Sequence, residues 1–121
     1  MGSETYHEPL ELLSEKARNL HRGIISLVEE LEAIDWYQQR AEACSDDALK
    51  RVLMHNRDEE IEHAVMTLEW LRRNDEKLAE TLREILFTDR DIASFDEAGA
   101  SEKPQSAATG SLAIGSLKAV F

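Results

Sequence analysis

Glu60 and His63 have the clearest chemical potential in the sequence, and they lie in the stretch EEIEHA at residues 59–64. Residues three apart on a helix are neighbours, so this carboxylate and this imidazole can reach one ion. No glycine or proline interrupts the surrounding sequence, which predicts a helix there. A Glu-x-x-His pair also occurs on ordinary solvated helices, so the pair alone does not define a metal site.

Glu30 supplies a second carboxylate on an inward-facing stripe. It follows Leu27 by three residues and precedes Ile34 by four, the spacing of one helix face. A carboxylate that faces a neighbouring helix is costly unless a cation, a metal or a proton compensates its charge. Two such carboxylates and an imidazole on adjacent helices favour a metal.

The predicted elements are three helices, at about residues 7–43, 46–73 and 76–87. Pro9 is tolerated in a first turn. The short connection at Ser45 predicts that the first two helices form an antiparallel hairpin. The fold class is therefore all-α: an antiparallel two-helix hairpin plus a short C-terminal helix.

A two-helix hairpin leaves each apolar stripe partly wet, and pairing two hairpins into a four-helix bundle removes that exposure. The metal chemistry requires the same pairing. Bundles that hold two iron ions use a Glu from each of two helices and a Glu-x-x-His from each of the other two. One chain supplies half of this set, so two copies related by a twofold axis complete it.

Three domains are expected from the change in composition along the chain: a helical domain at 7–90, a flexible linker at 91–110 and an apolar peptide at 111–118. The linker is rich in Ala, Ser, Gly and Thr. The peptide returns to apolar residues but is too short for a core element, and its position on a tether is typical of a docking peptide. Its key residues are Leu112, Ile114, Gly115 and Leu117.

The formal net charge of −11 disfavours nucleic acid and anionic membranes as partners. The single cysteine, Cys44, excludes an intrachain disulfide and favours a reducing compartment. No apolar run is as long as a transmembrane helix. These features predict a soluble protein of cytoplasmic type.

Further polar and aromatic side chains lie near the three candidate ligands in the sequence. Glu29 and Glu32 face away from Glu30 on a helix, and they could line a cation access route, form a second metal site, or belong to a solvated acidic face. Tyr37 follows Glu30 by seven residues on the same face. It could make a hydrogen bond behind the ligands, move an electron or proton, or simply pack at the bundle end.

Several blocks of sequence resemble one family, the encapsulated ferritins. They are HEPLELL at 7–13, EELEAIDWYQQR at 29–40, HNRDEEIEHA at 55–64, MTLEWLRRND at 66–75 and LFT at 86–88. The tail GSLAIGSLK at 110–118 is similar to peptides that dock cargo inside encapsulin shells. The resemblance covers about residues 7–90 and the tail.

The resemblance implies a ferritin-like four-helix bundle formed by two subunits, within an annular decamer. It implies a ferroxidase that oxidises Fe(II) with O2 at a di-iron centre, with Glu30, Glu60 and His63 as metal ligands and Tyr37 close by. Trp36 is expected beside this centre, and Glu29 and Glu32 at an outer metal or access site. Manganese, zinc or calcium could occupy the same ligands. The expected location is a bacterial or archaeal cytoplasm, inside an encapsulin nanocompartment that stores the iron.

Two other functions remain open from the sequence. The protein could be a non-catalytic iron-binding or iron-buffering cargo or adaptor protein, which takes up Fe(II) without consuming O2. It could also be an interaction module that binds no metal.

Overall fold

The computed structural model describes residues 6–95, and this part of the chain contains only helices. The order is the 3-10 helix η2 (Leu10–Leu12), α1 (Glu15–Ala43), α2 (Asp47–Asn74), α3 (Glu76–Ile85) and the 3-10 helix η3 (Ile92–Ser94). The all-α prediction is confirmed. The chain divides after Asn74 into two compact units, which we describe separately.

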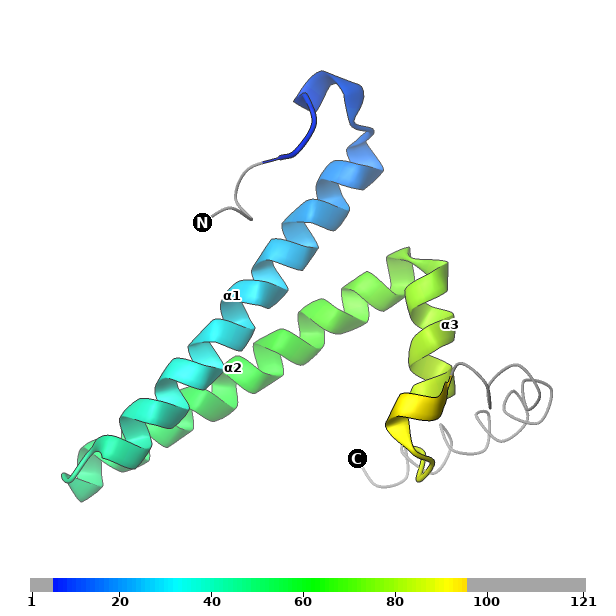
Figure 1. Ribbon diagram of the computed structural model, residues 1–121. Helices are drawn as coiled ribbons and strands as arrows, with labels where there is room; N and C mark the ends of the chain where they lie inside the picture. The colour runs from blue at the N-terminus through cyan, green and yellow to red at the C-terminus, as the bar shows by residue number, and fades with distance from the viewer. Residues whose placement is uncertain (1–5, 96–121) are drawn as a thin grey trace. The chain divides into compact units, whose positions relative to one another are not determined.

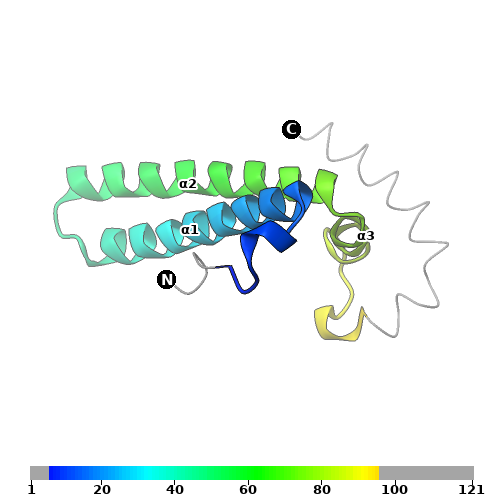
Figure 2. The ribbon, with the colours of Figure 1, turned by 90° about the horizontal axis from the view of Figure 1, so that it is seen from above.

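The first unit is the expected antiparallel hairpin of α1 and α2, which run side by side in Figures 1 and 2. Only residues 44–46 join the two helices. The carboxylate of Asp46 caps α2 by accepting a hydrogen bond from the backbone N–H of Leu49 at 2.8 Å. This cap and the short connection hold α2 against α1 from its first turn.

The start of α1 differs from the prediction, which placed it near residue 7. The helix begins at Glu15, because Ser14 is in an extended conformation and its side chain caps the backbone N–H of Ala17. The preceding residues form η2 and an extended Leu13. A guanidinium N–H of Arg18 donates to the carbonyl of Leu10, and the rings of Tyr6 and His21 stack with centroids 4.1 Å apart. The segment before α1 is thus held against this helix rather than extending it.

The seam between α1 and α2 has a small core. Its buried side chains are Ala41, Ala64 and Leu71, and no large side chain among residues 6–95 is fully buried. Many large apolar residues of the hairpin stay exposed: Ile24, Leu31, Trp36, Leu49, Val52, Val65, Met66 and Trp70. Burial of apolar area is the main favourable term in folding. In the single hairpin, much of the apolar area that could contribute to stability therefore stays exposed to solvent.

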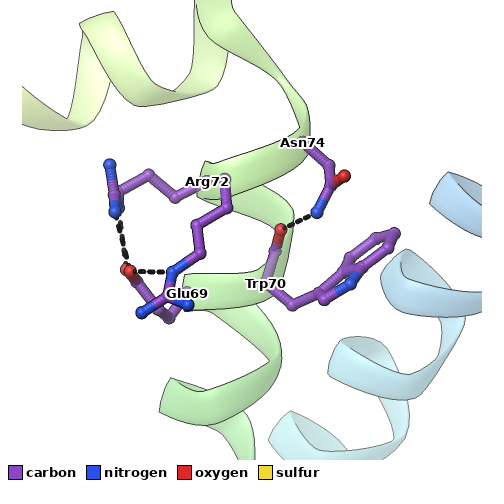
Figure 3. A network of polar contacts seen from close by, with 5 residues as sticks. Glu69, Trp70, Arg72 and Asn74 are labelled. Atoms are coloured by element: carbon purple, nitrogen blue, oxygen red, sulfur yellow. Dashed lines mark hydrogen bonds and ion pairs between the residues drawn. The ribbon is translucent and has the colours of Figure 1, made fainter.

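The C-terminal end of α2 carries a polar network, shown in Figure 3. Glu69 accepts two hydrogen bonds from Arg72, each 2.7 Å long, and one from Arg73 at 2.8 Å. The hydrogen bonds from Arg72, followed by that from Arg73, lower the pKa of the Glu69 carboxyl to about 2. The side-chain amide of Asn74 donates to the carbonyl of Trp70, which satisfies one acceptor at the helix end.

The second unit begins with α3, whose N-terminus is capped by Asp75 through the backbone N–H of Leu78. The helix ends at Ile85, two residues before the predicted end. Phe87 follows with a φ of 60°, in the left-handed region that stops a right-handed helix. Farther along, the buried ring of Phe95 lies 4.2 Å from the guanidinium carbon of Arg90.

The expected linker from residue 91 onward is described only as far as Phe95, and the expected docking peptide lies outside the described residues. Within residues 6–95, no helix has the length and apolar composition needed to cross a membrane.

Candidate metal centre

The hairpin brings three potential ligands together. Glu30 projects from the middle of α1, and Glu60 and His63 project from successive turns of α2. One ligand atom from each of them lies within 4.8 Å of the other two. Since α1 and α2 run antiparallel from a short connection, the middle of one helix lies beside the middle of the other, and the predicted neighbours meet.

The Nδ1 nitrogen of His63 lies close to both carboxylates of the cluster. Nδ1 of His63 lies 2.8 Å from Oε1 of Glu60, a hydrogen-bond distance, and 3.3 Å from Oε2 of Glu30. The hydrogen bond with Glu60, and then the charges of Glu30 and Glu60, raise the pKa of His63 above its usual value of 6.5, although desolvation opposes them. When the imidazole is protonated, its positive charge partly compensates the two carboxylates.

One carboxylate oxygen of the cluster, Oε2 of Glu30, has no hydrogen-bond donor among residues 6–95. Oε2 of Glu30 is buried as an atom and has no hydrogen-bond partner in this part of the chain; it lies 3.3 Å from Nδ1 of His63, the nitrogen that is hydrogen-bonded with Glu60. A buried acceptor that lacks a donor is destabilising. A cation would bind this oxygen together with the other carboxylate and the imidazole, so the donor set fits a metal.

The cluster is enclosed on one side only. The side chains of Glu30 and Glu60 are 26% and 23% exposed, whereas that of His63 is 50% exposed. Two carboxylates and one imidazole do not fill the coordination sphere of an iron ion, and the exposed part of His63 leaves the cluster open to further ligands. Carboxylate oxygens with imidazole nitrogen suit iron, and carboxylates alone with water suit manganese or calcium.

Within residues 6–95, the cluster makes no hydrogen bond or ion pair with the other residues that the sequence singles out. Tyr37 is half-buried and its ring lies 5.4 Å from the guanidinium carbon of Arg40, while Trp36 is exposed. Glu29 is exposed and Glu32 is half-exposed. Their roles beside the centre stay predictions.

Thr67 also contacts a residue of the centre, and the sequence did not predict this contact. Its hydroxyl donates to the backbone carbonyl of His63 at 3.0 Å, which ties the ligand's backbone to the next turn of α2. The signal in the sequence is the spacing of four residues between His63 and Thr67.

The fold and this cluster define an all-helical, ferritin-like class of protein, and comparisons with known proteins agree. The EncFtn-like family matches residues 5–89. The encapsulated ferritin-like protein of Rhodospirillum rubrum is 54% identical over 126 residues, which cover 97% of this chain and 90% of that protein. A ferritin-like protein of Thermotoga maritima is 48% identical over 102 residues, covering 83% of this chain and 90% of its own length.

A solved structure is also similar to this chain in fold and in sequence. The crystal structure of a protein from Nitrosomonas europaea superposes with a TM-score of 0.70 at 56% sequence identity, covering 73% of this chain and 97% of that one. The chain belongs to the EncFtn-like family.

The contacts of His63 in the cluster lead to a prediction about its pKa in metal-free protein. Its imidazole should titrate above pH 6.5 in NMR spectra of metal-free protein, because the hydrogen bond with Glu60 stabilises the charged form. A folded pKa above the unfolded value means that this contact stabilises the fold fully below pH 6.5 and stops doing so as the pH rises through the folded pKa.

The matched variant is Glu60→Gln, which keeps the shape of the side chain but removes its charge. The midpoint of His63 should fall towards 6.5 in this variant. An unchanged midpoint would show that Glu60 does not set the protonation of His63.

Proposed function

We propose that this protein is a ferroxidase that oxidises Fe(II) with O2 at a di-iron centre shared by two copies of the chain. The observation that carries the proposal is the meeting of Glu30, Glu60 and His63 within 4.8 Å, with an unsatisfied oxygen of Glu30 among them. Membership of the EncFtn-like family supports the same reading. Iron is the substrate here, and each Fe(II) gives one electron to O2.

The second copy completes the ligand set. One chain offers two carboxylates and one imidazole, so two copies offer four carboxylates and two imidazoles, the set used by di-iron bundles. The exposed half of His63 is where the second copy would approach. A twofold axis past this point would place both sets of ligands around the same pair of ions.

The surface around His63 supports this pairing. Met66 and Trp70 follow His63 along one stripe of α2 and Val52 precedes it on the same stripe, and all three are large, apolar and exposed, Met66 by 68%. Pairing this stripe with its copy would bury apolar area in the same step that closes the metal centre. The result is a four-helix bundle; a larger ring of subunits rests on the family resemblance alone.

The chain's own residues then have separate tasks. Glu30 and Glu60 attract and hold the cations, and carboxylate ligands favour the Fe(III) product over Fe(II). Nδ1 of His63 can bind a metal only when it carries no proton, so metal binding competes with protonation of this imidazole, whose pKa the hydrogen bond with Glu60 raises. Glu29 and Glu32, if they guide cations, act before this step.

We further propose that the protein works inside an encapsulin shell. The curated relative from Rhodospirillum rubrum is called encapsulated, and the residues Leu112, Ile114, Gly115 and Leu117 give this chain a tethered apolar peptide for docking. The shell would retain the oxidised iron, since an open hairpin has no closed cavity of its own for a mineral.

A non-catalytic alternative uses the same three ligands. In that case the protein would bind or buffer iron, and the centre would fix the oligomer without passing electrons to O2. Uptake of Fe(II) in stoichiometric amount, with no consumption of O2, would favour this alternative.

The ferroxidase proposal predicts that Glu60→Ala and His63→Ala lower the initial rate of Fe(II) oxidation at least tenfold, measured by absorbance of Fe(III) and by an oxygen electrode. Loss of an outer hydrogen-bond partner already weakens metal sites by about 10- to 100-fold, so loss of a ligand should do no less. Glu62→Ala, an exposed neighbour outside the cluster, is the control and should keep the wild-type rate. Wild-type rates in the two ligand variants would overturn the assignment.

The shared centre predicts that metal strengthens dimerisation. Fe(II) under anaerobic conditions should shift the monomer–dimer equilibrium towards dimer, because a ligand that binds only the assembled form stabilises it by mass action. Sedimentation velocity at a series of protein concentrations measures the shift, and His63→Ala should remove it. An assembly state that is the same with and without metal at every concentration would contradict a shared centre.

The docking proposal predicts that deletion of residues 111–118 abolishes loading into co-expressed shells and leaves the rate of Fe(II) oxidation unchanged. Co-purification of cargo with shells measures loading. Equal loading of the shortened and full-length chains would show that the peptide is not the docking element.

A further inference from the structure

Gly23 stands inside α1, where glycine is less favourable than alanine because it gains the most backbone freedom on unfolding. Its position in the seam explains its presence. A Cβ atom added there would lie 3.0 Å from Cδ2 of Leu71, and 3.1 and 3.2 Å from two ring atoms of Trp70. These distances are shorter than ordinary van der Waals contact, so something must move if a side chain is added.

The two neighbours differ in their freedom to move. Trp70 points towards α1 in Figure 3 and is 40% exposed in the single hairpin, so its ring has more room to shift than a fully buried side chain would have. Leu71 is only 4% exposed and is among the few buried side chains of the seam. A methyl group at position 23 would therefore press on Leu71, and since this side chain is buried we expect a small shift of α1 away from α2 to take up the strain.

This contact lies at the same seam as the metal cluster. Gly23 precedes Glu30 by seven residues, two turns along one stripe of α1, or about 10 Å along the helix axis. On α2, Leu71 follows His63 by eight residues. The Gly23–Leu71 contact and the Glu30–His63 contact thus join the same two helices at nearby levels.

The seam between these levels is not filled along one edge. A hollow of about 410 Å³ opens there, lined by Asn19, Arg22, Gly23, Ser26, Met66, Thr67 and Trp70. In Figure 1 the two helices spread apart towards the start of α1. Beside this hollow edge, the contact at Gly23 sets how closely the two helices approach on the side of the cluster away from their connection.

We propose that Gly23 is a positioning residue for the metal centre. By letting α1 rest directly on Leu71, it sets the separation at which Glu30 reaches Nδ1 of His63 and the carboxylate of Glu60. This inference rests on the proposed function, since it assigns Gly23 a role in forming the same metal site. Metal–ligand distances tolerate errors of only about 0.2 Å, so a small opening of the hairpin is enough to weaken binding.

The experiment compares wild type with Gly23→Ala, Leu71→Val and the double variant Gly23→Ala/Leu71→Val. Co(II) is the probe, because its visible absorption reports both affinity and coordination without any oxidation of iron. Gly23→Ala should bind Co(II) about tenfold more weakly than wild type, by analogy with the loss of supporting contacts at other metal sites. The double variant should bind as Leu71→Val does, because valine lacks the methyl group that lies 3.0 Å away.

Thermal unfolding of the metal-free variants provides a second readout. Helix propensity alone would raise the melting temperature of Gly23→Ala, whereas a forced separation of the helices lowers it. Gln39→Ala is the control, because Gln39 is exposed on α1 and also changes to a better helix former; the change removes only its hydrogen bond to Asp35, away from the cluster. It should leave Co(II) binding unchanged.

The outcomes separate this inference from the function on which it rests. A wild type that binds no Co(II) contradicts the metal site itself. A Gly23→Ala variant that binds Co(II) as tightly as a metal-binding wild type overturns only the role of Gly23. If Gly23→Ala does not fold, the double variant decides: folding and binding like Leu71→Val supports the contact, and failure to fold refutes it.

Discussion

Two carboxylates on neighbouring helices share one imidazole nitrogen in the middle of the hairpin, and this shared contact constrains the rest of the structure. The nitrogen has one proton to give, and Glu60 takes the hydrogen bond at 2.8 Å while an oxygen of Glu30 lies 3.3 Å away without a donor. Protonation of His63 therefore compensates the cluster only in part. A metal would satisfy both carboxylates at once, which is why the arrangement is interpreted as a binding site rather than an ion pair.

The same hairpin is incomplete in its packing. Its buried side chains are few and mostly small, and large apolar residues such as Met66 and Val52 are exposed on the face of α2 that carries His63. Hydrophobic burial and metal coordination both require a second surface at the same place. The proposed twofold pairing of hairpins would satisfy both requirements with one interface, and it would make assembly and metal binding mutually dependent.

Much of this could be predicted from the sequence because it depends on local spacing. The Glu60–His63 pair, the inward position of Glu30 and the short connection at Ser45 follow from helical periodicity and turn residues, and the structure brings the three side chains together. The start of α1 was not predictable in this way, because the apolar spacing continues through Leu13 while the cap at Ser14 decides the boundary. The Gly23–Leu71 approach was also missed, since it depends on how closely two distant segments pack.

The proposed function requires two metal ions to bind between two copies of this chain. Anomalous diffraction from crystals grown with a divalent metal tests it most directly, because it locates each ion relative to the protein side chains. A shared centre predicts two ions related by a twofold axis, with Glu30, Glu60 and His63 from both copies around them. Ions bound within single hairpins, or at positions remote from these residues, would contradict it.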